Sequence, residues 1–127
     1  MSPTPTGFDE VFATLKQLFR PHLDRLSVQP DSTTEYTLVG RKPSPFAQHK
    51  GHPMYFGMIR IGKAYVSFHL LPLYMYPEMK KLISPALRRR MQGKACFNFS
   101  SQDDGLLAEL GDLTKSALEA YRDKKLL

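Results

Sequence analysis

The sequence contains a single cysteine, Cys96, and no run of apolar residues long enough to cross a membrane. One cysteine cannot form a disulfide within the chain, and it cannot alone supply the ligands of a structural zinc site. A membrane-spanning helix needs about 18 or more apolar residues in succession, and residues 1–7 lack the basic and then apolar order of a secretory signal. We therefore expect a cytoplasmic protein without membrane association, stabilised by packing alone.

Recognisable catalytic motifs are also absent. The sequence has no glycine-rich phosphate loop, no serine nucleophile elbow and no pair of carboxylates placed for acid–base catalysis. These absences favour a binding domain over an enzyme. We assign no catalytic residue, no metal ligand and no cofactor from the sequence.

Positive charge is in excess, with 18 Lys and Arg against 12 Asp and Glu, which gives a formal net charge of +6. Such a charge favours encounters with anions, whether phosphorylated metabolites, an acidic protein surface or nucleic acid. Most of the excess lies in Arg41, Lys42, Lys50 and residues 80–94, which form either one patch or ordinary solvated side chains. No nucleic-acid-binding signature accompanies it, so a nucleic-acid partner is not favoured.

The N-terminal part predicts one amphipathic helix. Residues 1–6 are polar and contain prolines, so we expect them to be disordered, and Thr6 with Asp9 three residues later resembles a helix cap. Apolar residues then recur at three- and four-residue spacing: Phe8, Val11, Phe12, Leu15, Leu18 and Phe19. Because Pro21 removes a backbone donor, the helix is expected to end between residues 20 and 26.

The middle of the chain predicts strands. Residues 33–39 are rich in β-branched and aromatic side chains, which is typical of a strand. Residues 40–53 contain several prolines and predict a loop, long enough to indicate mobility or a binding role. Residues 54–71 form two alternating runs joined by Gly62-Lys63, the pattern of a β-hairpin with a two-residue turn.

This turn sorts the hairpin side chains into two faces. On the predicted core face the pairs are Ile61 with Ala64, Ile59 with Val66, Gly57 with Phe68 and Tyr55 with Leu70. On the other face they are Arg60 with Tyr65, Met58 with Ser67 and Phe56 with His69. Gly57 is expected to leave room for the ring of Phe68. The second face is the chemically richer one.

The last third of the chain predicts short helices, a strand and a long helix. Pro77 and Pro85 each suit the first position of a short helix, over residues 77–83 and 85–91. Residues 95–99 alternate as a strand, and Ser101 is expected to cap a final amphipathic helix. We therefore predict one α+β domain over residues 7–127, with an antiparallel sheet, N- and C-terminal helices packed on one face, and short helices inserted before the last strand.

Four segments carry a resemblance to a known family. Residues 65–74 (YVSFHLLPLY), 83–87 (ISPAL), 90–94 (RMQGK) and 96–99 (CFNF) resemble the YdhG-like family, a domain of unknown function, over roughly residues 8–121. The resemblance implies an α+β domain with terminal helices packed on an antiparallel sheet. Some members are described as frataxin-like iron chaperones, so it implies iron binding as an alternative function.

A frataxin-like iron surface uses clustered carboxylates, which suit a hard cation. The first helix here offers Asp9 and Glu10, with Asp24 further along. We therefore carry no iron ligand over from the family.

Two other residue pairs could carry chemistry. Cys96 and His69 could form a thiolate–imidazolium pair if their strands are neighbours, which would imply a thiol-dependent enzyme. The competing interpretation is a small buried cysteine and a histidine that only hydrogen-bonds. His49 and His52 could share a metal ion, although zinc needs three or four protein ligands.

The leading hypothesis is a binding domain whose second sheet face recognises a small anionic ligand or a protein partner. Its candidate ligand-binding residues are Arg60, Tyr65, Ser67, His69, Arg90 and Lys94, because guanidinium and ammonium groups suit oxyanions. Three successive arginines at positions 88–90 point in different directions on a helix, so they cannot all hold one anion. The sequence is compatible with a monomer or a homodimer.

Overall fold

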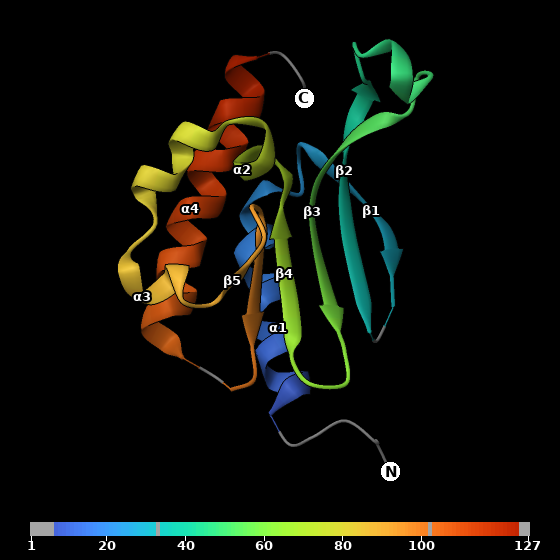
Figure 1. Ribbon diagram of the computed structural model, residues 1–127. Helices are drawn as coiled ribbons and strands as arrows, with labels where there is room; N and C mark the ends of the chain where they lie inside the picture. Colours follow the sequence, from blue (N-terminus) through green and yellow to red (C-terminus); the bar gives the residue numbers. More distant parts are fainter. Residues whose placement is uncertain (1–6, 33, 102, 125–127) are drawn as a thin grey trace.

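A computed structural model describes residues 7–32, 34–101 and 103–124 (Figure 1). The expected disorder of residues 1–6 and the expected Thr6 cap lie outside this part of the chain. The structure is an α+β domain with one six-stranded antiparallel sheet in the order β1-β2-β3-β4-β6-β5. The strands are β1 (Leu26–Asp31), β2 (Glu35–Pro43), β3 (Pro53–Ile61), β4 (Val66–Leu70), β5 (Met91–Gln92) and β6 (Cys96–Phe99).

Two long helices cover one face of the sheet, as predicted. The α-helices are α1 (Phe8–Phe19), α2 (Leu71–Met75), α3 (Pro85–Arg88) and α4 (Asp104–Asp123), and the 3-10 helices are η1 (Arg20–His22), η2 (Ala47–His49) and η3 (Pro77–Leu82). Figure 1 shows α1 behind the sheet and the short helices α2, η3 and α3 grouped beside α4. We call the sheet face that points away from α1 and α4 the outer face. None of the described helices is long and apolar enough to span a membrane.

The core lies between the sheet and α1, and the ring of Phe19 is at its centre. This ring stacks on Phe68 with 5.1 Å between centroids and meets Phe56 edge-on at 6.0 Å. A Cβ atom added to Gly57 would lie 2.7 Å from Cζ of Phe19. Gly57 therefore makes room for Phe19 of α1 rather than for Phe68, and its partner on β4 is Leu70.

The β3–β4 hairpin has a longer turn than predicted. Ile61 pairs with Val66, not with Ala64, and the amide of Gly62 donates to the carbonyl of Tyr65 over 2.9 Å, so residues 62–65 form the turn. The register is thus shifted by two residues. Because side chains alternate with a period of two, this shift leaves every β4 residue on its predicted face.

A β-bulge in β3 reverses two of the predicted faces. Leu38 pairs with Gly57 but Val39 pairs with Tyr55, which leaves Phe56 as the extra residue. Phe56 is fully buried in the core, whereas Tyr55 is 58% exposed on the outer face. The prediction placed them the other way round, because it assumed unbroken alternation along the strand.

Several element boundaries also differ from those predicted from the sequence. Helix α1 ends at Phe19, and the chain enters strand β1, which the sequence did not predict. Strand β2 runs on to Pro43, so the predicted loop over residues 40–53 is shorter. The side chain of Arg41 donates to the carbonyls of Leu23 and Leu26, which ties the start of β1 to β2.

The region before α4 is more extended than predicted. Helix α3 ends at Arg88, and the chain then forms the short strand β5 instead of continuing as a helix to Met91. The cap of α4 is Asp103 rather than Ser101, since its carboxylate accepts the amide of Leu106 over 3.1 Å.

Candidate functional site

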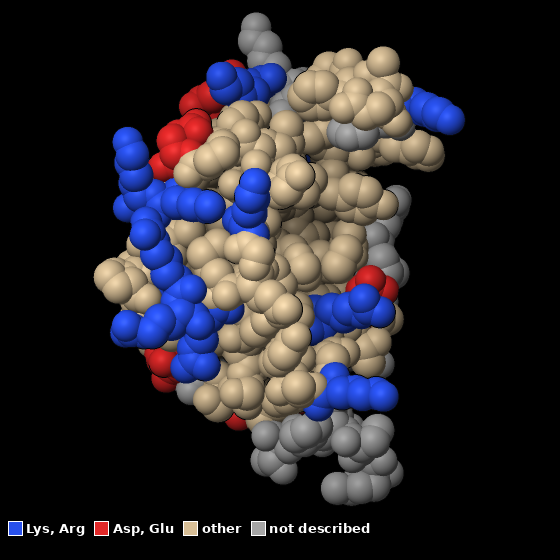
Figure 2. Space-filling model, viewed as in Figure 1, with Lys and Arg blue, Asp and Glu red and all other residues tan. Residues whose placement is uncertain are grey.

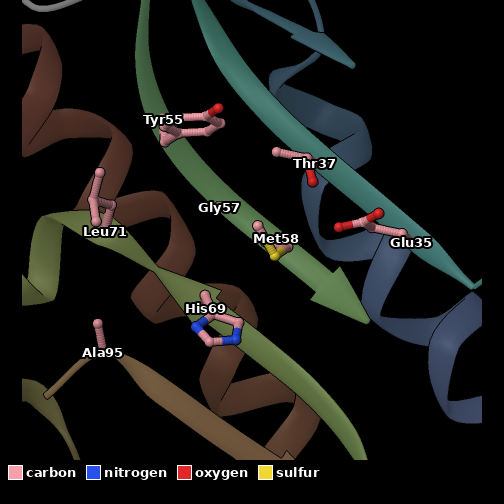
Figure 3. Close-up of a pocket in the computed structure, with 8 residues that line it drawn as sticks. All are labelled: Glu35, Thr37, Tyr55, Gly57, Met58, His69, Leu71 and Ala95. Carbon is pink, nitrogen blue, oxygen red and sulfur yellow. The ribbon is translucent and has the colours of Figure 1, made fainter. Parts of the chain in front are cut away.

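The outer face contains a pocket of about 410 Å³. In the space-filling view the centre of this face is hollowed, while the Lys and Arg side chains lie mostly around its edge and over η3 and α3 (Figure 2). We call this cavity the outer-face pocket. It is lined by Glu35, Thr37, Tyr55, Gly57, Met58, His69, Leu71 and Ala95 (Figure 3).

The bulge in β3 helps to form the outer-face pocket. In a regular strand the outward side chains are two residues apart. Here Phe56 and Gly57 both face the core, so the outward side chains of Tyr55 and Met58 are separated by two residues instead of one. Gly57 lies between them in the floor of the pocket (Figure 3). The extra residue therefore leaves a gap on the outer face.

Helix α4 supports the bulge from the core side. The hydroxyl of Tyr121, a fully buried residue, donates to the backbone carbonyl of Tyr55 over 2.8 Å. A bulge interrupts the regular ladder of hydrogen bonds between strands. The hydroxyl of Tyr121 gives the carbonyl of Tyr55 a hydrogen-bond partner at this interruption. Burial raises the pKa of the Tyr121 phenol, so the hydroxyl stays protonated and able to donate.

The outer-face pocket has an apolar end and a polar end. Tyr55 and Leu71 lie toward one end, Glu35 and Thr37 lie toward the other, and Met58 lies between the two ends (Figure 3). Among the described residues, the lining includes no lysine or arginine, and its only carboxylate belongs to Glu35. Arg60 is the cross-strand partner of Glu35, so its side chain leaves the sheet on the same face as that carboxylate.

Thr37 has an unusual environment. Its side chain is 2% exposed, and among the described residues its hydroxyl is the buried polar side-chain group without a hydrogen-bond partner. Leaving a buried hydroxyl unpaired costs about 1–3 kcal/mol. Unpaired buried groups are uncommon in folded proteins, and each one calls for an explanation, such as a role in binding.

The environment of His69 keeps its imidazole neutral. Its pKa is lowered by burial and, to a smaller extent, by the positive charge of Arg60. Its Nε2 atom lies 3.5 Å from Sγ of Cys96 on the neighbouring strand. Burial raises the pKa of the Cys96 thiol, against a smaller lowering by a hydrogen bond with Ser67. Both shifts favour the neutral forms, the opposite of a thiolate–imidazolium pair.

A row of polar side chains continues from this pair across β6 and β5. The thiol of Cys96 lies 3.5 Å from Oδ1 of Asn98, and the amide nitrogen of Asn98 donates to Oε1 of Gln92 over 2.8 Å. The hydroxyl of Tyr65 donates to the same oxygen over 3.2 Å. The polar groups of these side chains are already hydrogen-bonded to one another. They therefore form an ordered border beside the outer-face pocket.

The structure brings four of the six predicted ligand-binding residues to the outer face. Arg60 pairs with Ser67, His69 lies next on the same side of β4, and Tyr65 bonds to Gln92. Of these, His69 lines the outer-face pocket.

The other two predicted residues contact aromatic rings, and Lys94 directly precedes Ala95 of the pocket lining. The guanidinium of Arg90 lies 6.0 Å from the ring centre of Phe99, a core residue on the opposite side of the sheet. The amine of Lys94 lies 5.8 Å from the ring centre of Tyr74. The six residues therefore do not converge on one anion.

The described residues contain no group of three or more His, Cys, Asp or Glu side chains placed to hold a metal ion. His52 is exposed, and the side chain of His49 lies outside the described part of the structure. Metal binding by this pair, which the sequence offers only as an alternative, stays untested.

Sequence reasoning missed most of the pocket lining. Thr37 and Glu35 occupy the outward positions of β2, alternating with the buried Tyr36 and Leu38. That alternation is visible in the predicted strand over residues 33–39, so it could have placed Thr37 on the outer face. No comparable pattern in the sequence indicates that the side chain of Tyr55 points to the outer face.

Comparisons with family models, with curated proteins and with solved structures each return no match. The resemblance to the YdhG-like family therefore stays a prediction from the four sequence segments. The function proposed below depends on the geometry of the outer face.

Proposed function

We propose that this protein is a small-molecule-binding domain, and that the ligand occupies the outer-face pocket. The observation that carries the proposal is the unpaired hydroxyl of Thr37 in the wall of this cavity. A pocket with a mostly apolar lining and a few polar groups is the usual form of a ligand site.

The size of the cavity supports this function. Small-molecule sites usually have volumes of about 300–1,000 Å³, and the outer-face pocket, at about 410 Å³, falls near the lower end. An apolar cavity of about 150 Å³ already accommodates a benzene molecule. The pocket is thus suited to a compact ligand of one or two rings.

Binding is favoured over catalysis by the state of Cys96 and His69. Nucleophilic cysteine chemistry needs a thiolate, which a lowered cysteine pKa supplies. Here the pKa of Cys96 is raised and that of His69 is lowered. The neighbouring Asn98 is engaged with Gln92. A thiol-dependent enzyme and an iron chaperone are the less supported alternatives.

A blocking substitution tests the proposal. Ala95→Phe places a ring at the wall of the outer-face pocket, and Ala64→Phe places the same ring in the exposed β3–β4 turn as a matched control. A fragment library is screened against the wild type by thermal shift and by amide chemical shifts. We expect hits whose affinity falls at least tenfold in Ala95→Phe and is unchanged in Ala64→Phe. Hits that bind both variants as they bind the wild type, or no hits at all, would contradict the proposal.

A further inference from the structure

We infer that the outer-face pocket selects an uncharged ligand with an apolar, ring-sized body and one hydrogen-bonding head, such as a primary amide or a hydroxyl. This inference rests on the proposed function and specifies its ligand class. It replaces the small anionic ligand that the net charge of the chain favours.

The apolar end of the pocket suits the body of the ligand. Tyr55 presents a ring that is 58% exposed, and Leu71 and Ala95 contribute aliphatic surface at the same cavity. Met58 lies between the two ends (Figure 3). Its unbranched thioether side chain can adapt to the outline of a ring.

The polar end suits an uncharged head with a hydrogen-bond donor. The carboxylate of Glu35 is an acceptor and its negative charge repels an anion, and the described part of the lining holds no lysine or arginine to attract one. The guanidinium of Arg60, the cross-strand partner of Glu35, is carried on the same sheet face and disfavours a second cation there. A cationic head therefore gains little at Glu35, and a neutral donor avoids the cost of burying a charge.

Besides Glu35, Thr37 supplies a second hydrogen-bonding contact for the polar head of the ligand. Figure 3 shows the methyl end of Thr37 directed toward Tyr55 and its oxygen directed toward Glu35. The hydroxyl is covered in this conformation. A rotation of about 120° about χ1 moves the hydroxyl to the position that the methyl group occupies now, and moves the methyl group to the position of the Cβ hydrogen. A ligand head then gives the oxygen the partner that it lacks, so binding favours this rotation.

His69 lies on the β4 side of the pocket, across β3 from Thr37 and Glu35, and adds no charge (Figure 3). Burial lowers the pKa of its imidazole, and the residue lines the cavity. A neutral imidazole has one donor and one acceptor nitrogen. It therefore accepts an amide or hydroxyl head without attracting a carboxylate.

Four ring compounds of similar size test the ligand class. Toluene has no polar head, benzamide has a neutral head, benzoate is an anion and benzylamine is a cation. Their affinities are measured at pH 7.5 by titration of amide chemical shifts with the full chain. We expect benzamide to bind about three- to tenfold more tightly than toluene, the range of one net hydrogen bond, and benzoate and benzylamine to bind more weakly than benzamide.

Thr37→Val removes the hydroxyl and keeps the shape of the side chain. In this variant benzamide is expected to bind no more tightly than toluene. Thr114→Val is the matched control, because Thr114 is a buried threonine of α4 whose hydroxyl already donates to the carbonyl of Leu110. It is expected to leave all four affinities unchanged.

The outcomes separate this inference from the proposed function. If benzoate or benzylamine binds most tightly, or if toluene equals benzamide, the ligand class is wrong and the pocket still binds ligands. The class is also wrong if Thr37→Val leaves the preference for benzamide intact. If none of the four compounds binds and the library screen has no hit blocked by Ala95→Phe, both the inference and the proposed function are wrong.

Discussion

At the scale of single residues, Thr37 links stability to function. Its hydroxyl is buried without a partner in the described structure, and it belongs to the lining of the outer-face pocket. A protein selected for stability alone has no use for a hydroxyl at this position, since valine fills the same space. Binding sites commonly retain such unfavourable groups, so that replacing them raises stability and lowers activity.

Thr37→Val is therefore expected to raise the free energy of unfolding by about 1–3 kcal/mol, the cost of an unpaired buried hydroxyl. Urea denaturation of the ligand-free protein measures this change. The control Thr114→Val removes a hydroxyl that is bonded to Leu110 over 2.8 Å, and it is expected to give no increase. Equal stability of Thr37→Val and the wild type would mean that the hydroxyl has a partner in solution.

Gly57 supports the site from beneath the sheet. An added Cβ atom would lie 2.7 and 2.9 Å from two ring atoms of Phe19, and 3.1 Å from the carbonyl oxygen of His69. Phe19 is fully buried and stacked on Phe68, so it has little room to move. The absence of a side chain at position 57 thus permits the contact between α1 and β3.

Gly57→Ala is expected to lower the free energy of unfolding by about 1–3 kcal/mol, as overpacking of a core does. The control Gly105→Ala adds the same atom near the start of α4, where its nearest neighbour is an Asp103 side-chain oxygen at 3.7 Å. Alanine favours a helix over glycine by about 1 kcal/mol, so the control is expected to be neutral or stabilising. A Gly57→Ala protein as stable as the wild type would show that Phe19 is not confined.

At the scale of elements, the bulge in β3 and helix α4 act together. The bulge turns Phe56 inward and Tyr55 outward, and the hydroxyl of Tyr121 bonds to the carbonyl of Tyr55. The rings of Phe56 and Tyr121 also meet edge-on, with 5.7 Å between centroids. The position of Tyr55 at the outer-face pocket therefore depends on a residue of the opposite layer.

Tyr121→Phe keeps the ring contact and removes the hydrogen bond. It is expected to lower the free energy of unfolding by about 0.5–1.5 kcal/mol, and to weaken benzamide binding because Tyr55 is less firmly held. Denaturation and amide-shift titration measure the two effects. Tyr76→Phe, in the connection between α2 and η3, serves as the control for benzamide binding. Unchanged binding in Tyr121→Phe would show that the bulge holds its shape without this bond.

The elements predicted best from the sequence are those with strong periodicity. Helices α1 and α4 and strands β4 and β6 repeat their apolar residues clearly, and the structure confirms them. Strand β1 was missed because Leu23 and Leu26 continue the apolar stripe of α1 in the sequence. Strand β5 was missed because it is only two residues long and depends on pairing with β6.

The candidate site was predictable only in part, for a related reason. His69 was expected on the second sheet face, and it lies there because β4 alternates regularly. Tyr55 was expected in the core, since no local signal marks the bulge after it. The bulge is stabilised by Phe56 and Tyr121, and the latter is 66 residues away in the chain. Contacts over such a distance are set by the whole fold.

At the scale of the whole molecule, the excess positive charge and the candidate ligand site are in different places. Figure 2 shows the Lys and Arg side chains mostly around the edge of the outer face and over the short helices. Several of them have structural contacts: Arg41 bonds to the start of β1, and Arg88 donates to the carbonyl of Lys80 over 2.7 Å. The net charge of +6 therefore does not identify the ligand.

Two histidines make the stability of the domain depend on pH. Burial lowers the pKa of His69 and of His22, in each case as the largest effect. The unfolded chain then binds more protons than the folded one below the ordinary histidine pKa of about 6.5. The stability that these groups contribute is therefore fully present above this pH, and is lost as the pH falls toward their lowered values in the folded state.

His69→Asn is expected to lessen the loss of stability between pH 7 and pH 5, because one of the two contributing groups is removed. Urea denaturation at several pH values measures it. His52→Asn, at an exposed histidine before β3, is the control and is expected to leave the profile unchanged. A His69→Asn profile as steep as that of the wild type would show that burial does not disfavour the charged imidazole.

The central claim is that the outer-face pocket is where this protein binds its ligand. The most direct test is to map amide chemical shifts of the full chain while benzamide is added. We predict that the largest shifts fall on the strands around Thr37, Gly57 and His69. Shifts confined to the opposite side of the molecule, around His22 and Lys115, would contradict it, and so would the absence of any shift both with benzamide and with every compound of the fragment library.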